Sequence, residues 1–105
     1  MPKATPIKKP TDPVHPGEIL LEDFMKPAGL SVNALALALR VPATRIGAIV
    51  NEQRGITADT ALRLGRYFST TSKLWMNLQA DFDLRTAANT SRREIEQSVR
   101  PRNAA

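Results

Sequence analysis

The sequence predicts an all-α protein in which five helices form one domain, preceded by a flexible arm and followed by a helical tail. Two short helical patterns meet across a proline-containing turn within residues 32–51, which is the spacing of a helix-turn-helix. Only 5% of the residues are aromatic although 42% are hydrophobic. This composition is typical of a small helical protein with a leucine- and alanine-rich core rather than of a sheet.

We expect three parts along the chain. Residues 1–14 are rich in proline and lysine and show no apolar period, so they are expected to form a disordered arm. Residues 15–86 would form the domain, since 105 residues suffice for a single modest core. Residues 87–105 are a polar tail, in which Ser91 and Glu94 fit a capping box that would start a separate short helix.

The first helix is expected to open at His15, with Pro16 near its first position. Glu18 would then face the positive end of the helix dipole. Pro27 and Gly29 are expected to end this helix, because proline removes a backbone donor.

The helix-turn-helix would begin after Ser31, whose hydroxyl can cap the free N–H groups of a helix. The buried stripe of its first helix, at i, i+3, i+4 and i+7 spacing, consists of Val32, Leu35, Ala36 and Leu39. Pro42 fits the first position of the second helix. In that helix the residues expected to face inward are Ile46, Ile49 and Val50, and those left outward are Thr44, Arg45, Gly47, Ala48 and Asn51.

The outward face of the second helix suits the major groove of DNA. Small residues at Gly47 and Ala48 would allow close approach, and Arg45 can bind guanine O6 and N7. Two short amphipathic helices around a proline also occur in ordinary helical bundles, so the pattern alone leaves a purely structural role open.

The formal net charge of +5 is unevenly placed along the chain. Residues 16–39 carry a net charge of −2 and residues 40–66 a net charge of +3, so the basic part coincides with the second helix of the motif. This division favours a phosphate backbone as the partner on one side and a basic partner on the other. Patchy surface charge without a partner is the alternative.

Two further helices are expected. Gly55 can take a positive φ in the connection, and Thr57 would cap the next helix. The residues that this helix would bury are Ala61, Leu62, Gly65 and Phe68. The last helix would open at Ser72 and place Trp75 in the core or in a dimer contact.

The residue inventory argues against several classes of function. The chain has no cysteine, which excludes a disulfide framework and a thiolate metal site. No apolar run approaches the roughly 18 residues that a membrane span requires. His15 is the one histidine, and neither a metalloprotease motif nor a glycine-rich phosphate loop occurs. We therefore expect a cytoplasmic protein that is not an enzyme and needs no cofactor or metal.

Several motifs are spread over residues 15–86. They are His15-Pro16-Gly17-Glu18-Ile19-Leu20, Leu35-Ala36 through Val41-Pro42, Asn51, Arg54-Gly55-Ile56-Thr57, Thr60-Ala61-Leu62-Arg63-Leu64 and Leu74-Trp75-Met76-Asn77-Leu78-Gln79. Together they resemble the HigA antitoxins, which belong to the lambda-repressor-like, XRE-type helix-turn-helix proteins. Arg40 departs from the pattern, because many of these motifs have glycine there, and a left-handed backbone would be costly for arginine.

The resemblance implies an autorepressor that binds a palindromic operator as a homodimer and neutralises a RelE/HigB-like ribonuclease toxin. By position, it implies base contacts from Ala43, Thr44, Arg45 and Ala48 and phosphate contacts from Asn51 and Arg54. A free-standing XRE-type repressor without a toxin and a helical adaptor that binds only protein are the alternatives.

Two protein contacts are also predicted. The dimer contact would use Trp75, Leu78 and Phe82, which supply more apolar surface than so small a core needs. RelE-like toxins hold mRNA and are therefore basic, so the acidic residues of the first helix, Glu18, Glu22 and Asp23, are the expected toxin-binding surface. The alternative, carboxylates that only complement the helix dipole, applies most to Glu18.

Overall fold

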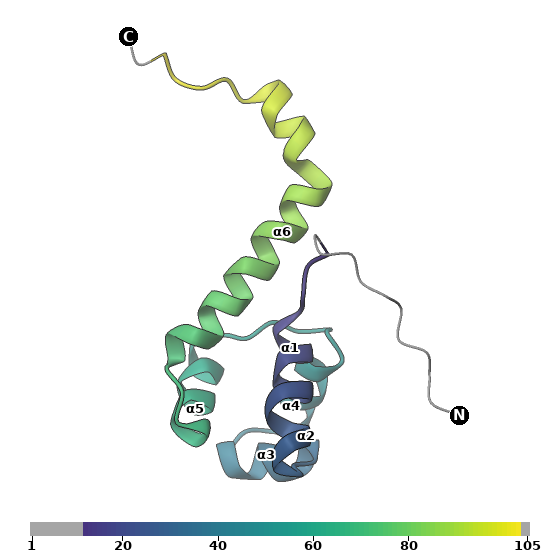
Figure 1. Cartoon of the computed structure of the whole chain (residues 1–105), viewed down its shortest axis with the longest axis vertical. Coiled ribbons are helices and arrows are strands. Elements are labelled where there is room, and N and C mark those ends of the chain that lie inside the picture. Colours follow the sequence, from purple (N-terminus) through teal and green to yellow (C-terminus); the bar gives the residue numbers. More distant parts are fainter. Residues whose placement is uncertain (1–11, 104–105) are drawn as a thin grey trace, which may run out of the picture.

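The computed structural model describes residues 12–103, so most of the predicted arm lies outside the described residues. Across 12–103 the regular structure is helical and forms five successive stretches, which confirms the all-α fold (Figure 1). The first stretch runs without a break through α1 (Pro16–Ile19), the π-helix η1 (Leu20–Met25) and α2 (Lys26–Ala28). The others are α3 (Val32–Leu39), α4 (Ala43–Val50), α5 (Ala58–Phe68) and α6 (Ser72–Ser98). No helix in this part of the chain is long and apolar enough to cross a membrane.

His15 fixes the start of the first helix. Its Nδ1 accepts a hydrogen bond from the Gly17 backbone N–H at 2.9 Å, and its extended backbone makes it the N-cap. Its ring also packs edge-on against Phe82 of α6, with the ring centroids 4.8 Å apart. The lone histidine is therefore a buried structural residue that joins the N-terminal helix to α6.

The first helix continues past the proline that was expected to end it. Pro27 lies inside α2, and the helix ends at Gly29, which has a left-handed φ of 67°. In η1 the hydrogen bonds span five residues, as from Lys26 N–H to the Leu21 carbonyl. This wider turn precedes Pro27, where a proline ring would otherwise crowd the carbonyl four residues back.

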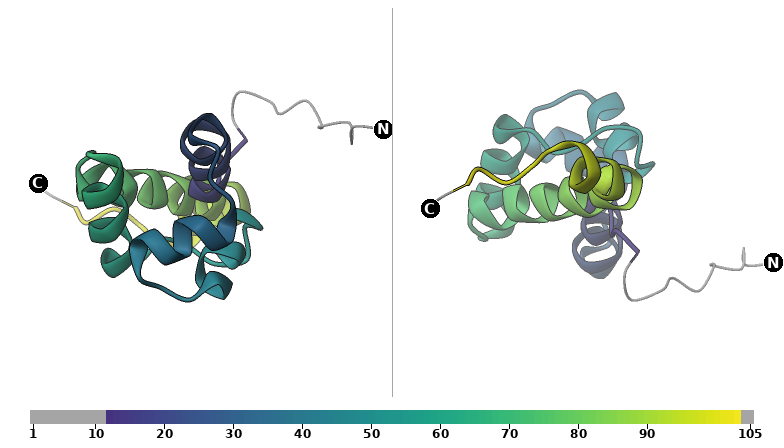
Figure 2. Two further views of the ribbon diagram at one scale, coloured as in Figure 1. Left: turned by 90° about the horizontal axis from the view of Figure 1, so that it is seen from below. Right: turned by 90° about the horizontal axis from the view of Figure 1, so that it is seen from above.

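One core holds the five helical stretches together. Its buried apolar members are Leu20, Met25, Leu35, Ala36, Leu39, Ile46, Ile49, Ile56, Ala61, Leu64 and Trp75. Seen from below, α3 crosses between α5 and the N-terminal helix (Figure 2). The helix-turn-helix is thus held from both sides.

The prediction that Leu62 lies in this core is wrong, because its side chain is 63% exposed. The buried side of α5 consists of Thr60, Ala61, Leu64 and Gly65. Leu62 lies about half a turn away from Leu64 and Thr60, on the outer face.

The predicted break before the tail is also wrong, because α6 is one helix of 27 residues. Ser91 and Glu94 lie within it, so no capping box forms. The hydroxyl of Thr90, just before Ser91, donates a hydrogen bond to the Thr86 carbonyl at 3.1 Å. This bond to the preceding turn allows a threonine inside a helix. The second half of α6 projects beyond the other helices (Figure 1).

Candidate nucleic-acid interface

α3 and α4 form the predicted helix-turn-helix. The Ser31 hydroxyl accepts a hydrogen bond from the Ala34 N–H at 3.1 Å and so caps α3 as expected. Pro42 is the N-cap of α4 rather than its first residue, and it makes no side-chain cap bond.

Arg40 occupies the left-handed region in the turn of the motif, with φ 60° and ψ 43°. The turn is tight, because the Val41 N–H reaches the Ala36 carbonyl at 3.0 Å, as in a Schellman motif. A non-glycine residue here requires either a strained left-handed backbone or a looser turn. Arg40 has the strained left-handed backbone. The left-handed backbone costs a residue with a Cβ atom about 1–2 kcal/mol.

Replacing Arg40 by glycine should therefore stabilise the protein. We expect Arg40→Gly to raise the free energy of unfolding by about 0.5–1 kcal/mol, because part of the relieved strain is offset by glycine's greater backbone entropy. The melting temperature should rise by about 2–8 °C, measured by far-UV circular dichroism. Arg40→Ala is the matched control, since it removes the charge and keeps the strain. Equal melting temperatures for the two variants would contradict the strain argument.

The residues with an implied DNA role fall into two groups. Thr44, Asn51 and Arg54 are exposed, whereas Ala43, Arg45 and Ala48 are half-buried. Thr44, Ala48 and Asn51 follow one another at four- and three-residue spacing and so share one face of α4. Arg54 lies in the connection after that helix.

Arg45 is paired with a carboxylate, which sequence reasoning did not predict. Its Nη1 donates to Asp59 Oδ2 at 2.7 Å, and Arg63 Nε donates to the same oxygen at 2.9 Å. Arg63 Nη1 also reaches the Leu39 carbonyl at 2.9 Å. The hydrogen bonds from Arg63 and then Arg45 hold the pKa of the Asp59 carboxyl below its ordinary value. The cluster of Arg45, Asp59 and Arg63 thus joins α3, α4 and α5 around the motif.

Gln79 is a second residue whose role sequence reasoning missed. Its Oε1 accepts the Ile56 N–H at 2.7 Å, and its Nε2 donates to Asp83 at 2.9 Å. A Cβ at Gly55 would lie only 2.9 Å from the Gln79 amide. The expected positive φ at Gly55 is wrong, and the feature that the structure shows there is close packing against the Gln79 amide. Gln79 therefore positions the connection that carries Arg54.

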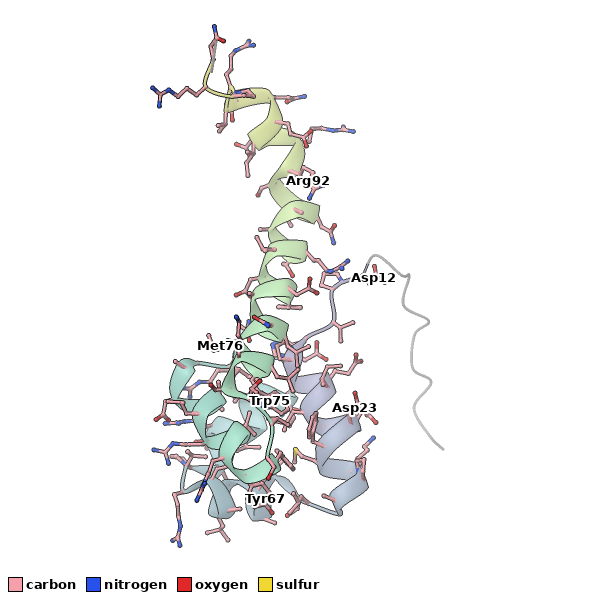
Figure 3. All side chains as sticks on the ribbon, turned by 60° about the vertical axis from the view of Figure 1, so that its left-hand side comes forward. Asp12, Asp23, Tyr67, Trp75, Met76 and Arg92 are labelled. Carbon is pink, nitrogen blue, oxygen red and sulfur yellow. The ribbon has the colours of Figure 1, made fainter. Side chains whose placement is uncertain are left out.

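Trp75 belongs to the core of a single chain. Its side chain is fully buried, its ring centroid lies 4.8 Å from that of Phe24, and Nε1 donates to Thr70 Oγ1 at 2.9 Å (Figure 3). A residue buried within one chain offers no surface to a second, so the core alternative replaces the dimer contact predicted for Trp75. Leu78 packs partly against the core, and the Phe82 ring contacts His15. Both side chains therefore make contacts within the single chain.

The acidic residues lie on the N-terminal helix. Glu22 and Asp23 are exposed and Glu18 is half-buried, and Asp23 projects from the outer side of this helix (Figure 3). Glu22 forms an ion pair with Lys26 at 2.8 Å. Of these residues, Glu18 lies on α1, which packs against α4, whereas Glu22 and Asp23 lie on η1.

No family model matches the sequence. Virulence-associated protein I of Dichelobacter nodosus is 60% identical over 74 residues, which are 70% of this chain and 68% of that protein. Antitoxin HigA-1 of Vibrio cholerae is 32% identical over 84 residues, 80% of this chain and 79% of that protein. The solved structure of Pseudomonas aeruginosa antitoxin HigA with the higBA promoter is 49% identical and superposes with a TM-score of 0.83, over 85% of this chain and 97% of that one. The chain therefore belongs to the HigA family of helix-turn-helix antitoxins.

Proposed function

We propose that this protein is an antitoxin and autorepressor that binds its operator as a homodimer and neutralises a RelE/HigB-like toxin. The observation that carries the proposal is a helix-turn-helix whose reading helix, α4, presents small and hydrogen-bonding residues outward. The similarity to a HigA structure with its promoter supports it. This role requires binding without catalysis, and operator binding places the protein in the cytoplasm. A toxin reading frame beside the gene would separate an antitoxin from a free-standing repressor.

We assign base contacts to the N-terminal part of α4 and phosphate contacts to its C-terminal side. Thr44 and Ala48 would meet base edges, with Ala43 beside them, while Asn51 and Arg54 would meet phosphates. Asp59 would hold Arg45 in place, so that the guanidinium loses little conformational freedom when it meets a base.

Arg45→Ala should weaken operator binding by about 1–3 kcal/mol and relax specificity at one base position. Fluorescence anisotropy with the operator and a panel of single base-pair changes measures both effects. Arg54→Ala should instead weaken all sequences alike and reduce the salt slope by about 1.

Asp59→Asn is the control that separates reading from positioning. It removes the carboxylate charge that holds Arg45 and leaves the arginine itself in place. If Asp59→Asn and Arg45→Ala lower affinity equally and for every sequence, Arg45 only positions α4. A wild-type base preference in Arg45→Ala would remove it from the reading residues.

We place the toxin on the acidic side of the N-terminal helix, at Glu22 and Asp23, with Glu18 at its edge. A toxin that holds RNA is basic, and Glu22 and Asp23 lie a turn beyond the strongest part of the helix dipole. Of these three residues, only Glu18 lies on α1, the segment that packs against α4.

The double variant Glu22→Lys/Asp23→Lys should slow toxin association by about tenfold or more and weaken the complex, because electrostatic attraction raises association rates. Stopped-flow and calorimetric titrations measure the two effects. Glu94→Lys/Glu96→Lys makes the same change of charge on α6 and should leave toxin binding intact. Unchanged toxin affinity in a folded Glu22→Lys/Asp23→Lys protein would move the docking surface elsewhere.

A further inference from the structure

Four helices in residues 12–103 end in the same hydrogen-bonded turn, in which one residue has a left-handed backbone. The N–H of the residue after it reaches a carbonyl five residues earlier, from Leu30 to Met25, Val41 to Ala36, Gln53 to Ala48 and Thr70 to Gly65. The left-handed residues, with φ between 57° and 67°, are Gly29, Arg40, Glu52 and Ser69. Glycine, which adopts this conformation without strain, occurs at the first of these turns and not at the other three.

The two turns at the ends of the reading helix carry opposite charges. Arg40 lies in the turn before α4, and Glu52 follows Asn51, the C-cap of α4. Both charged residues are exposed. A strained backbone conformation that is kept at an exposed, charged residue points to a function for its side chain.

Neither charge is neutralised within residues 12–103. Arg40 has no ion pair or side-chain hydrogen bond there. Arg63 links the Asp59 carboxylate to the turn through the carbonyl before Arg40, but that carboxylate is already shared by two arginines. Glu52 forms no ion pair with Arg54, although the two residues are close in sequence. Each charge is therefore available to a partner outside the chain.

We propose that Arg40 is a further phosphate-binding residue of the operator interface and that Glu52 opposes phosphate contact at the other end of α4. The inference rests on the proposed function and adds two residues to its DNA interface. Arg40 draws the N-terminal part of α4, to which base contacts are assigned, toward the DNA backbone. Glu52 repels the phosphates that Asn51 and Arg54 bind, so it keeps the operator affinity below its maximum.

Charge favours DNA over the toxin as the partner of Arg40. Residues 40–66 carry a net charge of +3, and a RelE-like toxin is itself basic, so this part of the chain repels it and attracts phosphates. Glu52 and Asp59 are the two acidic residues of this segment. Because Asp59 is held by arginines, Glu52 is the carboxylate whose charge acts on an approaching DNA backbone.

Matched neutral variants test the two charges and leave the backbone strain in place. Arg40→Gln should weaken binding to a duplex of the gene's own promoter by about five- to tenfold near 0.1 M salt and reduce the salt slope by about 1. Glu52→Gln should strengthen binding by about two- to fivefold, an effect that fades at high salt. The double variant should lie between the two single variants. Fluorescence anisotropy titrations at several salt concentrations measure all three.

Ser69→Gly is the control for strain. It relieves the same left-handed conformation at the end of α5, so it should raise the melting temperature as Arg40→Gly does and leave DNA affinity unchanged. Arg40→Lys keeps the positive charge and should retain most of the affinity. A scrambled duplex of the same length should give the same fold-changes as the promoter, because phosphate contacts carry no sequence information. Circular dichroism melting checks that each variant is folded.

The outcomes separate this inference from the proposed function. A wild type that does not bind the promoter duplex overturns both. If Arg45→Ala weakens binding but Arg40→Gln keeps the wild-type affinity and salt slope, only the inference fails. Fold-changes confined to particular base pairs would make Arg40 a base-reading residue and overturn its phosphate role. Weaker toxin binding by Glu52→Gln, with unchanged DNA binding, would assign Glu52 to the toxin surface and overturn its role at the DNA.

Discussion

Trp75→Ala should lower the free energy of unfolding by about 3–5 kcal/mol, a large part of the stability of a domain of this size. The side chain is fully buried and lies where α6 meets α5 and the N-terminal helix. Its ring faces Phe24 and Phe68, with centroid distances of 4.8 and 6.5 Å. Alanine would leave a cavity that three separate helices cannot close together, because each is fixed by other core residues.

Urea denaturation followed by far-UV circular dichroism measures this loss, since the variant lacks the only tryptophan of the chain. Trp75→Phe keeps an aromatic ring and loses the Nε1 bond to Thr70, so its loss should be only about 1–2 kcal/mol. Leu62→Ala removes an exposed leucine and should stay within about 0.5 kcal/mol of wild type. A Trp75→Ala midpoint close to that of Leu62→Ala would show that the tryptophan contributes little to the fold.

Local signals account for the parts of the fold that the sequence predicted. Ser31 and Thr57 cap their helices with hydroxyls that accept N–H groups three residues on, a short-range interaction visible in the order of residues. The buried stripe of α3 follows from helical periodicity in the same way. The family resemblance then supplied the function and the DNA contacts proposed above, which periodicity alone left open.

The incorrect expectations concern contacts between distant parts of the chain. The apolar character of Leu62 suggested that it is buried. In the packing of α5 against α3 and α6, however, Leu64 is buried and Leu62 is exposed. Gly55 suggested a turn conformation, whereas the structure shows its backbone packed closely against the amide of Gln79, which is 24 residues away. The partner of Arg45 is fourteen residues away on α5, and no periodic pattern links the two. Side-chain pairs of this kind become visible only when the helices are placed in space.

Gly17 is the clearest case in which one small residue fixes the position of the reading helix. A Cβ added at Gly17 would collide with the carbonyl oxygen of Ile49, near the C-terminal end of α4. The colliding atom belongs to the backbone, so a change of side-chain rotamer cannot relieve the contact. Accommodating an alanine therefore requires α1 and α4 to separate.

Gly17→Ala should lower the free energy of unfolding by about 1–3 kcal/mol, the usual cost of overpacking a close contact. It should also weaken operator binding by more than the loss of folded protein explains, because separation from α1 changes the position of α4. Gly47→Ala is the matched control on α4 itself. The nearest atom to a Cβ there, Val32 Cγ1, is 3.9 Å away, so alanine fits, and its helix propensity should add up to about 1 kcal/mol. Chemical denaturation of both variants and an anisotropy titration of Gly17→Ala measure the two effects. If Gly17→Ala is as stable as Gly47→Ala, the contact between α1 and α4 does not determine where the reading helix lies.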